Sequence, residues 1–157
     1  MGTSGARTTT VIPPRGEAYG GGVDFSSKPA TDTAWYNVPG LALTLPEAGV
    51  YTVTTEVTAQ VAAPPNTQIS IAQRLLVSGA VVPDSVRAVL FHGNAGTGGP
   101  STWSVATAAR TARHFVTAAG GDVVQVQVQR TSGGAHAGMP FTGIQNNGNR
   151  IEFVRAG

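Results

Sequence analysis

Three histidines and eight carboxylates are the side chains of this sequence most suited to acid–base chemistry or metal binding. His92, His114 and His136 are far apart, and none stands beside an acidic residue that would orient its imidazole. We therefore expect structural or loop roles for all three. The sequence leaves open whether two of the scattered carboxylates meet in the folded chain as a general acid and base. They are Glu17, Asp24, Asp32, Glu47, Glu56, Asp84, Asp122 and Glu152.

Other motifs that carry chemistry are missing from the sequence. There is no cysteine, hence no thiol nucleophile, and no Gly-x-Ser-x-Gly segment that would place a nucleophilic serine on a sharp turn. The glycine-rich segment 93–99 lacks the Gly-Lys-Ser/Thr of a phosphate-binding loop. We therefore expect no catalytic residue, no metal and no cofactor, and we predict that the protein is not an enzyme.

The charge pattern argues against nucleic acid as a partner and favours self-association. Only 11% of the residues are charged, and the ten cations, of which Lys28 is the one lysine, form no run. A nucleic-acid-binding domain is expected to cluster its lysines and arginines on one element. A surface with so few charges also has little electrostatic repulsion to keep copies of the chain apart.

Membrane and export signals are also missing from the sequence. No apolar run approaches the roughly 20 residues that span a bilayer. The first residues lack the apolar segment of a secretory signal peptide. We expect a protein made in the cytoplasm, with no membrane partner.

The composition predicts an all-β domain. The chain of 157 residues is long enough for one hydrophobic core. Valine and threonine are abundant and are interrupted by 21 glycines and ten prolines, which suits short strands and tight turns. Residues 1–30 differ from the remainder: they contain Pro13-Pro14, three consecutive glycines and few apolar residues. We interpret 1–30 as an extended arm and 31–157 as the folded domain.

Strict alternation of apolar and polar residues marks the strands of this domain. The clearest example is 51–61, where every second residue is apolar or small, as in a strand with one buried face. The segment 103–117 can be one long strand or two short ones. We predict that Tyr51, Val53, Val57, Val124, Val126 and Val128 are buried on facing sheets. The expected strands are 33–38, 41–45, 51–61, 69–77, 85–91, 103–117, 124–128 and 150–155, with Pro39-Gly40 as a turn.

Three of these segments resemble the C1q/tumour-necrosis-factor-like jelly rolls, especially the small versions found in bacteriophage structural proteins. The first is 35–53, with Leu-x-Leu-Pro-x-x-Gly-x-Tyr-x-Val at 43–53. The second is 116–128, where Gly121-Asp122 turns into alternating valine and glutamine, and the third is the closing strand 151–154. The resemblance covers 31–157. It implies an antiparallel jelly-roll sandwich that assembles as a homotrimer, with one sheet of each subunit turned toward a threefold axis.

Pairs of large apolar neighbours support such an assembly independently. Adjacent side chains on a strand point to opposite faces, so a pair of large apolar neighbours favours burial on both sides. The pairs are Trp35-Tyr36, Phe115-Val116 and Phe153-Val154. Alternatively, one member of each pair is exposed beneath a loop. The candidate trimer-interface residues are Trp35, Tyr36, Phe115 and Val154.

The resemblance favours a virion structural protein, specifically a homotrimeric capsid decoration protein without enzymatic activity. Its arm would bind the major capsid protein or another virion protein, unless it packs only on its own domain. The arm residues expected to contact that partner are Arg7, Val11, Ile12, Arg15, Tyr19 and Phe25.

Two other classes of function remain open. One is the tip of a tail or head fibre that binds host-surface glycans through the loops 93–100 and 132–148, near Trp103 and His136. The other is an enzyme or a module for a soluble ligand.

Overall fold

The part of the chain that the structure describes is built entirely from strands and loops. The structure is a computed structural model, and it describes residues 12–29, 31–96, 103–133 and 142–156. No helix that could cross a membrane is found among these residues. The strands are β1 (Arg15–Gly20), β2 (Val23–Asp24), β3 (Trp35–Thr44), β4 (Gly49–Ala63), β5 (Thr67–Val77), β6 (Ala80–Val81), β7 (Arg87–Asn94), β8 (Ser104–Ala118), β9 (Val123–Gly133), β10 (Gly143–Ile144) and β11 (Asn149–Ala156).

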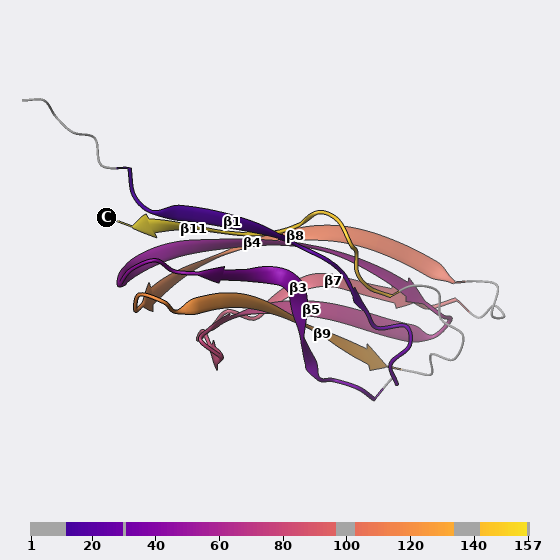
Figure 1. Cartoon of the computed structure of the whole chain (residues 1–157). Helices are drawn as coiled ribbons and strands as arrows, with labels where there is room; N and C mark the ends of the chain where they lie inside the picture. The colour runs from indigo at the N-terminus through magenta and orange to yellow at the C-terminus, as the bar shows by residue number, and fades with distance from the viewer. Residues whose placement is uncertain (1–11, 30, 97–102, 134–141, 157) are drawn as a thin grey trace, which may run out of the picture.

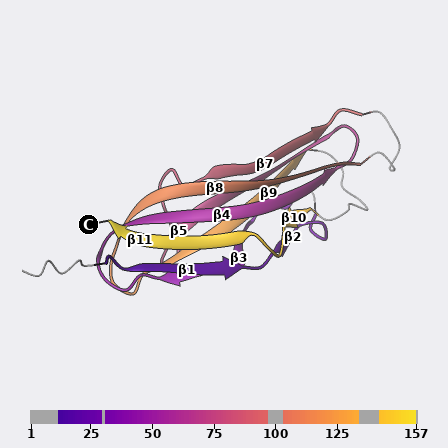
Figure 2. The same cartoon turned by 90° about the horizontal axis from the view of Figure 1, so that it is seen from above.

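These strands form two antiparallel sheets that pack face to face (Figure 1). In the first sheet the long strands lie in the order β1, β11, β4, β8, as Figure 2 shows from above, and the short strands β10 and β2 extend it. In the second sheet the order is β3, β9, β5, β7, with β6 beside the end of β5. Every pairing is antiparallel, and the chain crosses repeatedly from one sheet to the other. The expected antiparallel jelly-roll sandwich is thereby confirmed.

The core lies between the two sheets, where the alternation placed it. All six residues predicted to be buried, on β4 of one sheet and β9 of the other, are 0% exposed. The ring of Tyr51 meets that of Phe153 edge to face, with centroids 5.4 Å apart, and its hydroxyl donates to the carbonyl of Glu47 at 2.7 Å. The segment 103–117 proves to be one strand, because β8 pairs with β4 along its whole length.

Pro39-Gly40 interrupts a strand and does not join two separate ones, which corrects the expected turn. The segments 33–38 and 41–45 are parts of β3, whose register with β9 shifts between Asn37 and Ala42. Because β3 is an edge strand, the proline nitrogen leaves no ladder bond unmade. Gly40 has a φ of +79°, which a side chain would strain. The Pro39 carbonyl accepts from the amide of Gly21 at 2.8 Å.

The boundary expected at residue 31 is wrong for the described part of the arm, because residues 15–24 supply two strands of the first sheet. All six residues of β1 pair with β11. The inward positions of β1 are small because neighbouring side chains already fill the space: a Cβ on Gly16 would lie 2.7 Å from the Phe153 ring, and one on Gly20 would lie 2.5 Å from Leu41. A strand with glycine at its buried positions shows no apolar alternation, so the sequence pattern could not reveal it.

Candidate assembly surface

The outer face of the first sheet carries the exposed side chains that combine into a surface. Residues paired directly across the strands lie at one level along the strand direction, so each level forms a row of four. Two adjacent rows contain the apolar and charged side chains of this surface. The apolar row is Arg15, Val154, Thr52 and Phe115, and the charged row is Glu17, Glu152, Thr54 and Arg113.

Large apolar side chains are exposed in the apolar row. Phe115 is 73% exposed and Val154 is 43% exposed, whereas their neighbours Val116 and Phe153 are buried in the core. Two of the three apolar pairs thus place one member inside the sandwich and the other on the same outer face. The other outward positions of β4 and β8 include threonines and two exposed valines, Val50 (43%) and Val105 (56%), and Val50 is adjacent to Thr52 on this face.

The other two interface candidates, Trp35 and Tyr36, lie on β3 in the second sheet and do not join this surface. The guanidinium of Arg74 covers the Trp35 ring, 4.3 Å from its centroid. The Tyr36 ring packs edge to face on Phe25, and its hydroxyl donates to Asp32 at 2.5 Å. Tyr36 is therefore engaged within its own chain.

The six residues predicted to bind a partner through the arm are divided by the structure. Phe25 is 1% exposed within the core, so its assignment as an anchor for a partner is wrong: the crossover after β2 turns its ring inward. Ile12 is 75% exposed and Tyr19 is 68% exposed, and Arg15 lies on the outer face of the first sheet. Arg7 and Val11 lie outside the described residues.

Two acidic residues stand directly opposite each other on the outer face, a pairing that the sequence left open. Glu17 and Glu152 are directly opposite in the pairing of β1 with β11. A groove of about 460 Å³ lies beside them, lined by Arg15, Gly16, Glu17, Glu152, Phe153 and Val154. Like charges directly opposite on antiparallel strands destabilise the pair. The sequence could not reveal this contact, because only the strand register brings the two residues together.

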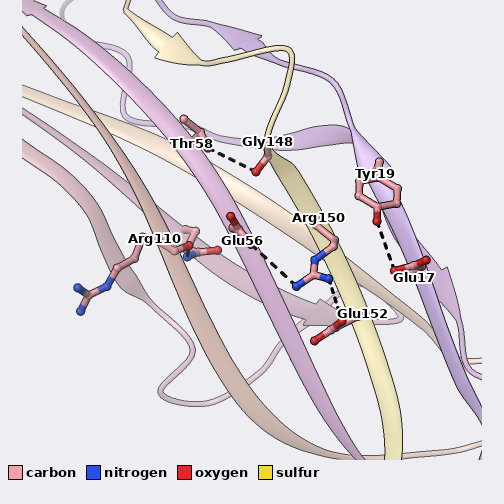
Figure 3. A network of polar contacts seen from close by, with 9 residues as sticks. Glu17, Tyr19, Glu56, Thr58, Arg110, Gly148, Arg150 and Glu152 are labelled. Atoms are coloured by element: carbon pink, nitrogen blue, oxygen red, sulfur yellow. Dashed lines mark hydrogen bonds and ion pairs between the residues drawn. The ribbon is translucent and has the colours of Figure 1, made fainter.

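One arginine partly neutralises this acidic group. Arg150 lies 3.3 Å from Glu152 and 4.0 Å from Glu56, and the Tyr19 hydroxyl donates to Glu17 at 3.4 Å (Figure 3). Glu17 itself has no ion-pair partner among the described residues. Two carboxylates thus share the Arg150 guanidinium, and Arg15 lines the groove beside Glu17 without an ion pair among the described residues.

The opposite edge of the same sheet is basic. The strand β8 contains Arg110, Arg113 and no acidic residue. Within the described part of the chain neither arginine forms an ion pair. Alternation places Arg113 on the outer face and Arg110 on the other face of the strand, and Figure 3 shows the Arg110 guanidinium pointing away from the acidic group.

A second polar cluster, which sequence reasoning missed, fixes the crossover before β3. Arg130 is 1% exposed, and its guanidinium donates to the carbonyls of Phe25 at 2.7 Å, Lys28 at 3.3 Å and Pro29. Burial lowers the pKa of Arg130, while Asp32 and Tyr36 act in the opposite direction. Alternation along β9 contained the signal, because it places Arg130 on the same inward face as the buried valines.

The histidines are dispersed in the fold. The His92 imidazole lies 2.8 Å from the Ser104 hydroxyl, His114 is buried on the inner face of β8, and His136 lies outside the described residues. Among the residues that the structure describes, no three histidine, aspartate or glutamate side chains are grouped so that they could hold a metal ion.

His114 predicts a loss of stability in mild acid. Burial lowers its pKa below the ordinary value of 6.5, and the positive charge of Arg87 lowers it further. The unfolded chain then binds the proton more readily, so this contribution to stability is complete above about pH 6.5 and decreases below it. We expect the melting temperature to fall between about pH 6.5 and pH 5, and to fall less in His114→Gln. Identical melting curves across that range for the two proteins would exclude this role.

Comparison with known proteins adds a distant structural likeness. No protein-family model matches the sequence, and no curated protein matches it. Among solved structures, the chain is similar to Eiger TNF from S. frugiperda, with 16% identity and a TM-score of 0.44 over 94% of each chain. The assignment of the jelly roll rests on the strand order of the two sheets.

Proposed function

We propose that the protein is a non-enzymatic, homotrimeric virion structural protein that decorates a capsid. The observation that carries the self-assembly is the exposure of Phe115 and Val154 in the apolar row, with Val50, 43% exposed, in the next row of the same face. Exposed apolar side chains on such a face mark an interaction surface. The resemblance of strands 31–157 to phage jelly rolls supports the virion setting.

The attachment element in this proposal is the segment before β1, and its partner is the major capsid protein or another virion protein. Residues 15–24 are committed to the first sheet, and Phe25 to the core. Ile12 is exposed and open to a partner, and residues 1–11 lie outside the described part of the chain. The scattered cations give nucleic acid and membrane surfaces no basic stripe to bind, so we propose neither as a partner.

Deleting residues 2–14 tests this assignment. The truncated protein is expected to keep a near-normal melting temperature and the mass of three chains in light scattering, because every strand of the described residues, from β1 onward, is kept. Its binding to undecorated particles is expected to be lost. The full-length protein, incubated with the same particles, is the control. If the truncated trimer decorates particles to full occupancy, the segment is not the anchor; if the full-length protein is a monomer at micromolar concentration, the assembly is wrong.

The alternative function, a fibre tip that binds host-surface glycans, is favoured by one polar groove. It has a volume of about 530 Å³ and lies where β5 begins and β7 ends. Amide and hydroxyl groups are suited to the hydroxyl groups of a neutral sugar. Hundreds of copies per particle would indicate decoration, and a handful would indicate a fibre. The groove is lined by Asn66, Thr67, Gln68, Gly93, Asn94 and Ala95.

A further inference from the structure

The two free edges of the first sheet carry complementary charges. We propose that each subunit inserts Arg113 between Glu17 and Glu152 of the next subunit, and places Phe115 against Val154 of that subunit. The occupant of this face is therefore a second copy of the chain. The inference rests on the homotrimer of the proposed function and specifies which residues meet within it.

On the acidic side of the contact, Glu17 has no ion-pair partner among the described residues. Glu17 and Glu152 face each other across β1 and β11, and Arg150 is shared between Glu152 and Glu56. Like charges held directly opposite repel each other, and one more guanidinium would relieve that repulsion. The groove of about 460 Å³ beside the two carboxylates is also lined by Arg15, which forms no ion pair with a described residue, and it offers space for such a side chain.

The basic side has the matching chemistry. Arg113 is exposed on the outer face of β8, an edge strand without acidic residues, and it has no ion pair with any described residue. Phe115 lies two positions after Arg113 on the same face and is 73% exposed. Arg113 and Phe115 are two positions apart on β8, which is the same spacing as that of Glu152 and Val154 on β11.

The register of the sheet aligns these partners in a ring. Arg113 shares a row with Glu17 and Glu152, and Phe115 shares the adjacent row with Val154. A rotation about an axis parallel to the strands moves each row around the axis without shifting it along the axis. The β8 edge of one copy therefore meets the β1–β11 edge of the next with rows matched. Such a contact joins two different patches, as a closed cyclic ring requires.

Charge reversal tests this contact. Arg113→Glu and Glu17→Arg, each alone, are expected to remain folded, because both side chains are exposed, and to change the scattering mass from three chains to one. The double variant Glu17→Arg with Arg113→Glu restores an opposite-charge pair between positions 17 and 113, while position 113 then meets a like charge at Glu152, so the trimer is expected to be recovered in part. Arg110→Glu is the matched control, since it reverses the same charge on the other face of the same strand, and it is expected to remain a trimer.

The neutral variants Arg113→Gln and Glu17→Gln keep the proposal testable if a reversed charge impairs folding. Each is expected to raise the dissociation constant of the trimer roughly tenfold or more. If Glu17 had only a structural role in its own sheet, Glu17→Gln would not raise the dissociation constant of the trimer, because removing one of two facing carboxylates stabilises the sheet. The contact would be overturned if Arg113→Glu formed trimers as stable as those of Arg110→Glu, or if the double variant stayed monomeric. Either result would leave the trimer itself intact as a proposal. A monomeric wild-type protein would overturn the trimer itself.

Discussion

Replacing Val126 with aspartate is expected to abolish folding. Val126 is 0% exposed at the middle of β9, a strand that pairs with β3 on one side and β5 on the other. An isolated carboxylate at this position has no charged partner, and its burial costs several kcal/mol at least, against about 5–15 kcal/mol of total stability. Circular dichroism and thermal melting of the purified variant measure the effect.

The matched control for this variant is Gln125→Asp, one residue earlier on β9. Its side chain points to the opposite face of the second sheet and is partly exposed, so the same new charge remains hydrated. We expect a melting temperature close to that of the wild-type protein. If Val126→Asp instead folds and melts like Gln125→Asp, the inward face of β9 is assigned incorrectly, and with it the position of the core between the sheets.

The strands with apolar alternation were predictable because half of each strand faces the core and half faces solvent. On β4 this contrast persists over most of its length, so the inward positions from Tyr51 onward follow from the sequence alone. On β9 the valines give the same contrast against the glutamines. The same alternation places the side chain of Arg130 on the inward face of β9, although its hydrogen bonds to the crossover could not be predicted from the sequence.

The strand β1 could not be predicted because its buried face consists of residues without apolar bulk. Gly16 and Gly20 are small since Phe153 and Leu41 fill the space that their side chains would need. Those neighbours come from distant parts of the sequence. The composition of residues 1–30 therefore resembles that of a linker, even though β1 is fully paired with β11.

The candidate surface depends on contacts between residues that are far apart in the chain. Phe115 and Val154 were identified from their large apolar neighbours, a local pattern that the structure places in one row. The opposition of Glu17 and Glu152 follows only from the register of β1 with β11. Cross-strand register is set by the whole fold, so sequence spacing carried no information about this pair.

Replacing Arg130 with methionine is expected to release the crossover before β3 and destabilise the protein. Methionine fills much of the apolar volume of the arginine stem but donates no hydrogen bond, so the carbonyls of Lys28 and Pro29 lose their donor. Hydrogen bonds from a charged donor contribute about 1.5–3 kcal/mol each. Removing a buried charge with one nitrogen, Nε, unpaired among the described residues offsets part of this loss. We expect a net cost of about 2–4 kcal/mol, or roughly 5–15 °C in melting temperature.

The variant Arg130→Lys separates the charge of Arg130 from the geometry of its guanidinium. An ammonium is a compact, strongly hydrated charge and cannot reproduce the planar fork that reaches three carbonyls. We therefore expect Arg130→Lys to destabilise the protein at least as much as Arg130→Met, because it keeps the cost of burying the charge and loses part of the bonding. Thr131→Ala, an exposed neighbour on β9, is the control and is expected to melt like the wild-type protein.

Amide hydrogen exchange locates the effect of Arg130. The amide of Lys28 donates to the Phe25 carbonyl, which also accepts from Arg130. Exchange at Lys28 therefore reports on the hydrogen bonds of Arg130 to this turn. We expect exchange at Lys28 to accelerate in both Arg130 variants, while the amides of β4 keep their order of protection, because the core between the sheets is unchanged. If Arg130→Met shows wild-type melting and wild-type exchange at Lys28, the turn is stable without Arg130, and the buried guanidinium contributes no net stability.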